Sequence, residues 1–350
     1  MTQSNGMTSM ERVLTTLGFK EPDRVPWFPL LTMTGARELG LSIREYFSSG
    51  KNVAEGQLRM WAKYGHDCLY AFFYAPVEIE AWGGEVIYAE DGPPNSGEPF
   101  LSNPEEIPGL EPPQIEESPC LLKVLDAIEK MKREAGDEVP IIGVVMSPFS
   151  LPVMQMGFDR YLDLLSERPD LFRRLMEVNE AFTVSWANAQ LNAGAVAICY
   201  FDPVSSSTIV PRKLFLETGF PVARRTISRI KGPVAVHFAS GRCLSLLDDL
   251  AETGALIAGV SAEESLRELK RASRGRLTLL GNLNGLEMRR WSSRQAEDEV
   301  KKAISAGGPG GGFILSDNHG EIPWQVSDEI LFAMRDAVRT WGGYPLDWIG

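Results

Sequence analysis

The chain has 350 residues, of which 44% are hydrophobic and 23% are charged, and its formal net charge is -12 at pH 7. This length allows one large α/β domain or two smaller ones, and the negative charge argues against nucleic acid or an anionic membrane surface as a partner. The four cysteines are scattered, the segment 1–10 is polar, and no apolar run approaches the roughly 18 residues of a membrane span. These features predict a reduced, cytoplasmic protein without a secretion signal.

Apolar runs and helical periodicity alternate along the chain, which predicts alternating strands and helices. A helix is expected at 10–17, ahead of the first strand. Strands are expected at 25–31, 68–73, 141–145, 196–200, 234–237, 256–260, 277–280 and 313–315. Helices are expected between them at 43–64, 121–134, 161–190, 211–230, 244–252, 262–272 and 294–305.

Two further stretches predict excursions from this alternation. Gly83-Gly84 lies between the short apolar stretches 77–81 and 85–89, which indicates a hairpin outside the main sheet. The stretch 91–113 is rich in Pro, Gly and Glu and is expected to run over the surface.

Eight strands, nearly all followed by helices, favour a single (β/α)8 barrel domain over residues 1–350, with an N-terminal helical extension. A doubly wound sheet is the alternative. No Gly-x-Gly-x-x-Gly stands at a strand–helix junction, which weakens the dinucleotide-binding form of that alternative. The glycine-rich run 307–312 precedes a strand, so it predicts a flexible loop and not a phosphate cradle.

In a barrel, the functional groups come from the carboxyl ends of the strands. His237 ends the fifth predicted strand and His319 follows the eighth, so two of the three histidines are expected to converge on one mouth. The other side chains singled out at strand ends are Tyr74, Glu78, Met146, Phe149, Tyr200, Phe201, Asp202 and Asn282. Aromatic and apolar groups mixed with imidazoles and carboxylates suit a flat, largely apolar ligand with one reactive polar atom.

Several of these residues also have a structural interpretation. A histidine on a strand can be a hydrogen-bonded core residue, Asp202 before Pro203 can cap the following loop, and Glu78 can lie on the solvated face of a hairpin. Cys199 is expected to face away from the barrel interior if Asp202 faces in, because strand side chains alternate with period two. Cys243, close after His237, is expected to open a helix.

Five segments resemble the uroporphyrinogen decarboxylase superfamily, and most closely its corrinoid-dependent methyltransferase branch. They are Pro22–Pro26, Tyr200–Pro203, Asp249–Ala255, Leu280–Asn284 and Gly312–Leu315. The resemblance covers nearly all of the chain. It implies a (β/α)8 barrel, which agrees with the strand count.

The resemblance also separates two activities. Decarboxylases of this superfamily carry an Arg-Gln-Ala-Gly-Arg element after the first strand that grips substrate carboxylates, whereas here only Arg37 can take that role. Methyl-transferring relatives carry His-x-Cys after the fifth strand and Cys after the eighth, all binding zinc. His237 matches the first of these ligands, Ala239 or Ser240 stands where the second is expected, and His319 stands at the third.

A site of imidazoles and carboxylates is harder than a thiolate site and suits an oxygen ligand. The resulting hypothesis is a corrinoid-dependent methyltransferase of the O-demethylase type, in which zinc polarises the ether oxygen of a methoxylated compound, and the apolar lining admits an aromatic one. The methyl group would pass to Co(I) of a cobalamin-type corrinoid on a partner protein. The expected zinc ligands are His237, His319 and Glu78, and the expected catalytic residues are Asp202 and His319. The expected substrate contacts are Tyr74, Met146, Phe149, Tyr200, Phe201 and Asn282.

Three alternatives stay open from the sequence. They are methyl transfer from a corrinoid to a thiol of the coenzyme M type or to a pterin, uroporphyrinogen decarboxylation, and a non-catalytic barrel that binds a tetrapyrrole. Homodimers occur in the decarboxylase branch, so the resemblance also implies a homodimer as one oligomeric state of this chain.

Overall fold

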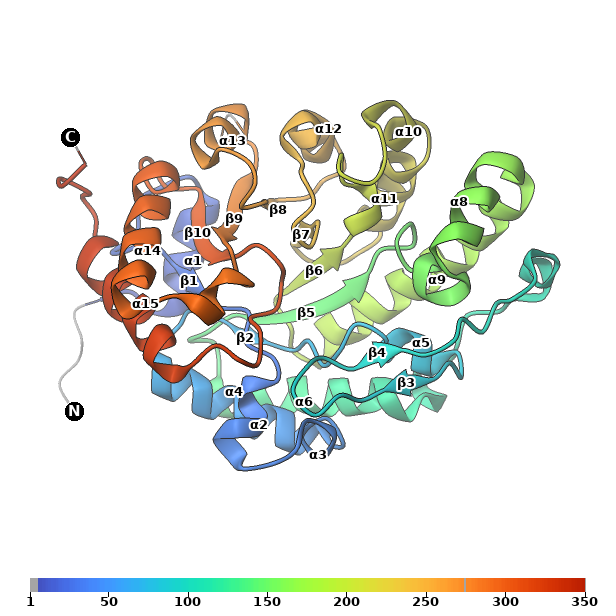
Figure 1. Ribbon diagram of the computed structural model, residues 1–350, viewed down its shortest axis with the longest axis horizontal. Helices are drawn as coiled ribbons and strands as arrows, with labels where there is room; N and C mark the ends of the chain where they lie inside the picture. The colour runs from blue at the N-terminus through green and yellow to red at the C-terminus, as the bar shows by residue number, and fades with distance from the viewer. Residues whose placement is uncertain (1–5, 274, 350) are drawn as a thin grey trace.

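The computed structural model describes residues 6–273 and 275–349. Its centre is a parallel sheet of eight strands in the order β1-β10-β9-β8-β7-β6-β5-β2 (Figure 1). The strands are β1 (Trp27–Phe28), β2 (Leu69–Tyr70), β5 (Ile141–Met146), β6 (Ala197–Phe201), β7 (Val234–His237), β8 (Ile257–Gly259), β9 (Thr278–Leu283) and β10 (Phe313–Asp317). The end strands β1 and β2 meet where the N–H of Asp67 donates to the carbonyl of Trp27 at 2.9 Å. The strands therefore curl into a ring, and the predicted (β/α)8 barrel is confirmed.

The inside of the ring is filled by a cluster of buried apolar side chains, here called the interior cluster. It takes at least one residue from each of the eight strands: Phe28, Tyr70, Val144, Cys199, Phe201, Ala235, Ile257, Leu280 and Ile314. Phe72, just beyond β2, also belongs to it. A cavity of about 30 Å³ remains among these side chains. The barrel centre is thus packed, as is usual for this fold, and any ligand site has to lie at an end of the barrel.

Helices surround the strands and bury their apolar faces against them (Figure 1). They are α2 (Thr34–Leu39), α3 (Ile43–Tyr46), α4 (Gly50–Tyr64), α6 (Pro119–Ala135), α7 (Pro152–Met156), α8 (Phe158–Glu167), α9 (Pro169–Ala193), α10 (Arg212–Glu217), α11 (Gly219–Ile227), α12 (Leu247–Glu252), α13 (Leu266–Ser273), α14 (Ser293–Gly307) and α15 (Asp328–Trp341). Short 3₁₀ turns are η1 (Pro104–Gly109), η2 (Ile115–Glu117), η3 (Pro203–Ser205), η4 (Leu244–Leu246) and η5 (Glu287–Arg290). None of the helices in the described residues has the length and apolar composition that crossing a membrane requires.

The single helix predicted at 43–64 is two helices, α3 and α4. The chain breaks at Ser48-Ser49, where the Ser49 hydroxyl accepts from the N–H of Asn52 and so caps the start of α4. An N-cap serine satisfies a donor that the first helical turn leaves unpaired, which favours a new helix start at this point.

The hairpin predicted between 77–81 and 85–89 is wrong, although a different hairpin lies in this region outside the main sheet. The stretch 77–81 forms the short helix α5 (Val77–Ala81), and the hairpin pairs β3 (Val86–Ile87) with β4 (Asn95–Ser96). The alternation of Val and Glu in 77–81 resembled a half-buried strand. In the structure Val77, Glu78 and Ile79 are all buried, so the alternation did not reflect a solvated face.

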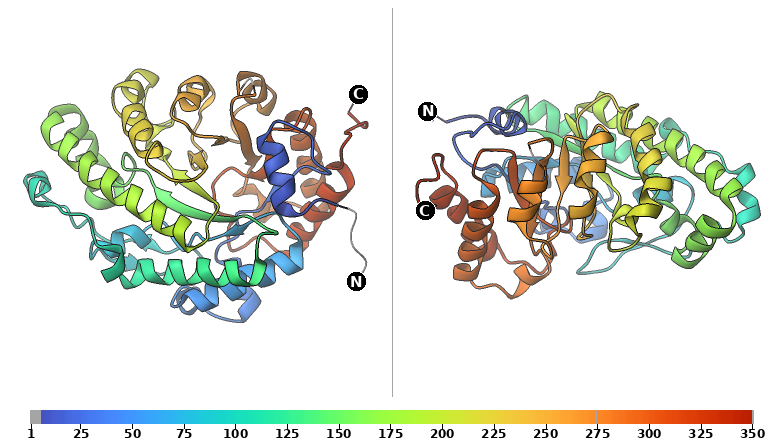
Figure 2. Two further views of the ribbon diagram at one scale, coloured as in Figure 1. Left: turned by 180° about the vertical axis from the view of Figure 1, so that it is seen from behind. Right: turned by 90° about the horizontal axis from the view of Figure 1, so that it is seen from above.

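The predicted N-terminal extension is α1 (Ser9–Leu17), which lies behind the barrel in the view of Figure 1 and in front in the left panel of Figure 2. Val13 of α1 belongs to the interior cluster, so this helix closes the amino end of the barrel. A side chain on Gly311 would overlap the main chain of Lys20, and Gly311 has φ +68°. The glycine-rich run therefore lets the segment after α1 approach β10 closely.

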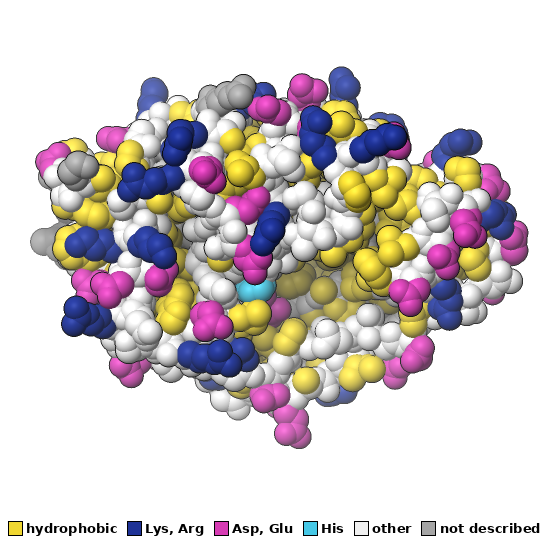
Figure 3. Space-filling view, turned by 45° about the horizontal axis from the view of Figure 1, so that its top comes forward, with side chains coloured by type: hydrophobic (Ala, Val, Ile, Leu, Met, Phe, Trp, Pro, Cys, Tyr) yellow, Lys and Arg dark blue, Asp and Glu magenta, His cyan; other side chains and the backbone are white. Residues whose placement is uncertain are grey.

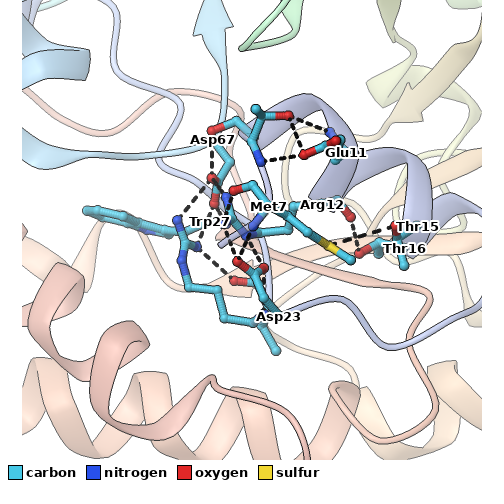
Figure 4. Close-up of polar contacts among 12 residues, drawn as sticks. Met7, Glu11, Arg12, Thr15, Thr16, Asp23, Trp27 and Asp67 are labelled. Carbon is cyan, nitrogen blue, oxygen red and sulfur yellow. Dashed lines mark hydrogen bonds and ion pairs between the residues drawn. The ribbon is translucent and has the colours of Figure 1, made fainter. Parts of the chain in front are cut away.

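An ion-pair network fixes α1 to the first two strands (Figure 4). The Asp67 carboxylate, which has no exposed surface, accepts from Arg12 Nη1 at 2.7 Å, from Arg24 Nη1 at 2.7 Å and from the N–H of Trp27 at 2.8 Å. Arg12 also pairs with Asp23 at 2.6 Å. The segment Pro22–Pro26, which carried part of the family resemblance, thus serves stability at the amino end of the barrel and not the chemistry at the other end.

Candidate functional site at the carboxyl end of the barrel

The loops that follow β7 and β10 are joined directly, and this joint places the two strand-end histidines at one mouth. The N–H of Ser240 donates to the carbonyl of Asn318 at 2.7 Å, and the Ser240 hydroxyl hydrogen-bonds Nδ1 of His319. The charge of His319 contributes to lowering the pKa of His237, after the larger effect of burial. The expected convergence of His237 and His319 is therefore present in the structure.

Ala239 and Ser240 form a strained turn directly after His237. Their φ angles are +45° and +77°, in the left-handed region that residues with a side chain rarely occupy. Such strain persists where the surroundings hold it, and it gathers at functional sites. The Asn318 carbonyl and the His319 ring hold this turn from the β10 side.

The His237 ring is buried, with 1% of the residue exposed, and burial lowers its pKa to about 3. Its Nδ1 accepts from the N–H of Ala239 at 3.0 Å, and its Nε2 has no hydrogen-bond partner in the described residues. Phe201 packs on the ring at 4.9 Å between centroids. Side chains on Gly259 or Gly320 would press against the ring, so both positions are close-approach glycines.

Two carboxyl groups that the predicted site did not include lie in the same loop as His319: Asp317, which is buried, and Glu321, which is partly buried. Asp317 Oδ2 accepts from the N–H groups of His319 and Gly320 at 2.9 and 2.8 Å, while Oδ1 has no partner in the described residues. Burial raises the pKa of Asp317 to about 6. Burial, together with the charge of Asp317, also raises the pKa of Glu321 to about 7, although Thr32 donates a hydrogen bond to it. The sequence signal that could have identified Asp317 and Glu321 as site residues is their position in the polar segment after the eighth predicted strand.

Three aromatic residues predicted to line the pocket belong to the main hydrophobic core. Tyr74, Phe149 and Tyr200 are buried in the main hydrophobic core that joins strands and helices, and not in the interior cluster. Tyr74 donates to Glu80 at 2.6 Å, and Phe149 packs edge-on against Tyr161. None of the three belongs to the interior cluster, and their role as substrate contacts stays a prediction.

The expectation that Cys199 faces away from the barrel interior depended on Asp202 facing in, and that condition does not hold. Cys199 and Phe201 point into the interior cluster, whereas Asp202 turns toward the loop after β5. The Asp202 carboxylate accepts from the hydroxyls of Ser147 and Ser150 at 2.6 and 2.7 Å, and its burial raises its pKa. These contacts join the ends of β5 and β6, and the Asp202 side chain makes no capping hydrogen bond to the following turn η3. The catalytic role of Asp202 stays a prediction. Cys243 is buried and precedes η4, close to its expected place.

Glu78 does not join the histidines either. Its Oε1 accepts from the N–H of Met146 at 2.8 Å, so the side chain joins α5 to the end of β5. Its Oε2 is buried without a partner in the described residues, and burial raises its pKa to about 8. The predicted set His237, His319 and Glu78 is corrected, because residues 6–273 and 275–349 contain no group of three or more His, Cys, Asp or Glu side chains arranged for a metal. Two imidazoles fall short of the three protein ligands of a catalytic zinc site, so the residues do not fit the expected zinc.

The two remaining predicted substrate contacts, Met146 and Asn282, lie in different places: Met146 packs on the interior cluster, and Asn282 lines a groove elsewhere on the protein. Met146 is partly buried against the interior cluster. Asn282 donates to the carbonyl of Ser261 at 2.9 Å and lines a separate groove of about 460 Å³ that also involves Glu264 and Lys302. Met146 therefore keeps its predicted role as a proposal, and Asn282 instead helps to hold the loop after β8.

A hollow is visible on the face shown in Figure 3, with one imidazole at its edge and hydrophobic side chains on its floor. Of the three histidines, His66 and His237 are buried and His319 is partly exposed. The mouth of the barrel thus combines an apolar floor with a small number of polar groups, which is the usual makeup of a small-molecule site.

The close packing of Gly320 and Phe201 against the His237 ring gives a direct test of the site. A side chain at Gly320 would overlap the Phe201 ring and reach within 3.3 Å of His237 Cε1, and Gly320 has φ +86°. Gly320→Ala is therefore expected to displace both rings and to cost about 1–3 kcal/mol of stability. Chemical denaturation measures the cost. Gly109→Ala is the control, since nothing lies within 4 Å of a side chain at that position.

Comparison with known proteins identifies relatives of this chain in sequence and in fold. The chain is 26% identical to a uroporphyrinogen decarboxylase of Bordetella petrii, over 91% of the chain and 93% of the relative. It is 24% identical to the methylcobamide:CoM methyltransferase MtaA of Methanosarcina barkeri, over 79% and 83%. A methyltransferase structure from Methanosarcina mazei superposes with a TM-score of 0.81 at 21% identity, over 95% and 99%. Residues 8–341 match the model of the uroporphyrinogen decarboxylase (URO-D) family, and the chain belongs to this family.

Proposed function

We propose that this chain is a corrinoid-protein-dependent methyltransferase that removes the methyl group from the oxygen of a methoxylated compound with an apolar, aromatic body. The methyl acceptor is the reduced corrinoid of a partner protein that docks over the carboxyl end of the barrel. The buried free cysteines fit a reducing, cytoplasmic setting.

The charged groups at the carboxyl end of the barrel favour a neutral methoxylated substrate over the polyanionic substrate of a decarboxylase. Arg37, the sole candidate for gripping substrate carboxylates near β1, donates to the carbonyls of Trp324 and Val326 at 2.8 and 3.0 Å. Arg242, in the loop after β7, pairs with Glu263 at 3.0 Å. A polyanionic porphyrinogen needs free cationic groups, whereas the loop after β10 at this mouth carries the carboxyl groups of Asp317 and Glu321. A neutral ether with an aromatic body meets no such charge conflict.

The proposed reaction moves the methyl group from oxygen to the corrinoid. The corrinoid supplies the electron pair for the new bond to carbon when it is bound at the mouth. The C–O bond breaks, its electron pair stays on oxygen, and the alcohol or phenol product takes its proton from solvent. The task of the chain is to hold the ether on the apolar floor beside Phe201 and to place hydrogen-bond donors at the departing oxygen.

The relatives support this assignment in outline. The name of the M. barkeri relative includes a methylcobamide, and the M. mazei relative is described as a methyltransferase. The thiol acceptor in the M. barkeri name is not part of the proposal, because both Cys positions of the thiolate-rich pattern are occupied here by Ala239 or Ser240 and by His319.

A spectral assay tests the proposal. The protein is mixed with a reduced corrinoid protein and a panel of methoxylated aromatic compounds, and the conversion of Co(I) to methyl-Co(III) is followed. At least one methoxylated compound is expected to give the change, while the matched hydroxylated compound, which has no methyl group to transfer, gives none.

Decarboxylation is the second candidate, because decarboxylases are the relatives at 26% identity. Uroporphyrinogen decarboxylase would replace the proposed function if the protein removes carboxylate groups from uroporphyrinogen and none of the methoxylated aromatic compounds converts Co(I) to methyl-Co(III). Methylation of a thiol by a methylated corrinoid, without the reverse reaction from ethers, would instead favour the thiol-methylating alternative.

A further inference from the structure

We infer that His237 carries its proton on Nε2 and presents this N–H as a fixed hydrogen-bond donor to an oxygen atom of the bound methyl donor, in the place where the family resemblance implies a metal ion. The identity of the ligand rests on the proposed function, whereas the state of the imidazole does not.

The ring of His237 has one available orientation. Gly259 lies against its Cδ2 edge, and Gly320 with Phe201 lies against its Cε1 side. Rotating the ring by half a turn would set Cδ2–H against the N–H of Ala239, which now donates to Nδ1 at 3.0 Å. That exchange would replace a hydrogen bond by a repulsive contact, so the observed orientation is held from three sides.

This orientation fixes the tautomer. A neutral imidazole has one N–H donor and one acceptor nitrogen. Nδ1 acts as the acceptor because the Ala239 amide can only donate, so the proton has to be on Nε2. The cationic form, which has a proton on both nitrogens, would set Nδ1–H against the N–H of Ala239 and place a charge in a buried site. The strained turn at Ala239 and Ser240 is what aims the amide at Nδ1.

The same tautomer conflicts with metal binding at Nε2. A metal takes the lone pair of one nitrogen, and the other nitrogen then donates its N–H to a carboxylate, a carbonyl or water. Here the other nitrogen faces an N–H donor, so ligation through Nε2 would require an imidazolate that retains no proton. The donor set argues in the same direction, since the described residues supply no third ligand beside the histidines.

The Nε2–H group has no partner in the described residues and is buried. A buried donor without an acceptor is costly, so such groups call for a ligand or another specific explanation. An ether oxygen that gains negative charge as its methyl group leaves is an acceptor of increasing strength. A fixed N–H therefore binds the transition state more strongly than the ground state. His237 keeps its proton throughout, and the C–O electron pair stays on the departing oxygen.

Nuclear magnetic resonance of the resting protein tests the tautomer without any substrate. The chain has three histidines, so His66→Gln and His237→Gln variants assign the long-range proton–nitrogen correlations. His237 is expected to show a protonated Nε2 and an unprotonated Nδ1. A protonated Nδ1 with an unprotonated Nε2 would overturn the inference.

Metal analysis provides the second readout. Protein expressed with added zinc and passed over a desalting column is expected to hold far less than one zinc per chain, with the same value for His237→Gln. One zinc per chain in the wild type, lost in His237→Gln, would contradict the inference even if methyl transfer occurs.

Kinetic variants complete the test once a substrate is found. His237→Ala removes the donor and is expected to lower the rate of methyl transfer by about 10²–10³-fold. His237→Gln can accept from the Ala239 amide and still offer an N–H, so it is expected to recover most of that loss. A His237→Gln rate as low as that of His237→Ala would overturn the donor role. His66→Gln, at the amino end, is the matched control and should keep the wild-type rate.

The outcomes separate the two proposals. The predicted tautomer and zinc content without methyl transfer from any ether would remove the proposed function and leave the state of His237 intact. Methyl transfer by a zinc-loaded protein would do the reverse.

Discussion

Asp67→Ala is expected to lower the free energy of unfolding by about 3–5 kcal/mol, because it removes the buried anion that joins two arginines to the first strands. Asp67 is fully buried and accepts from Arg12, Arg24 and the N–H of Trp27. Without it, the Arg12 guanidinium stays in a site with only 8% of its side chain exposed and keeps Asp23 alone as an ionic partner. The Trp27 N–H also loses its acceptor.

Urea unfolding measures the loss, and amide hydrogen exchange locates it. Exchange in α1 and at Trp27 is expected to accelerate first, since the network fixes α1 to β1 and β2. Glu55→Ala removes an exposed ion pair with Arg59 and should change stability by about 0.5 kcal/mol or less. A loss under about 1 kcal/mol for Asp67→Ala would mean that the network does not hold the amino end of the barrel.

Glu78→Gln is expected to stabilise the protein by an amount that grows with pH. Glu78 is fully buried, and burial raises its pKa from the ordinary 4.5 to about 8. The folded chain therefore holds a proton that the unfolded chain releases between these two values. Each pH unit in this window costs the folded state about 1.4 kcal/mol. Below pH 4.5 both states are protonated and the cost vanishes, while above pH 8 it reaches its limit.

The glutamine keeps an oxygen to accept from the Met146 N–H but carries no ionisable proton. The gain in unfolding free energy is expected to be close to zero near pH 4 and on the order of 3–5 kcal/mol at pH 9. Glu116→Gln, at an exposed position, should show no such growth. A gain independent of pH would show that the Glu78 carboxyl ionises equally in the folded and unfolded chains.

The barrel could be predicted because its later strands are continuous apolar runs bounded by polar residues. β7 and β10 lie within two residues of their predicted bounds for this reason. β1 and β2 are two residues long, although runs of six or seven residues were expected. The sequence there is as apolar as a longer strand, but Pro29 has no N–H to extend the ladder after β1, and the pairing of β2 with β5 stops at Tyr70.

The side chains at the site could be predicted only in part. His237 and His319 follow from the abrupt end of an apolar run. The sequence does not show which side chains of β6 point into the barrel. Cys199, Tyr200 and Phe201 are all apolar enough for either side of a strand that is buried on both faces. A shift by one residue exchanges Tyr200 for Phe201 at the mouth, and no polar residue within β6 marks the correct choice.

The helix that closes the amino end of the barrel has a consequence for turnover. Because the barrel interior is packed and Val13 of α1 covers its amino end, we expect the methyl donor, its demethylated product and the corrinoid of the proposed reaction to use the same opening at the carboxyl end. For the proposed reaction the small molecule has to enter before the partner protein seals the opening, and the product can escape only after the partner has left. The rate at which the two proteins separate therefore sets an upper limit on the number of cycles per second.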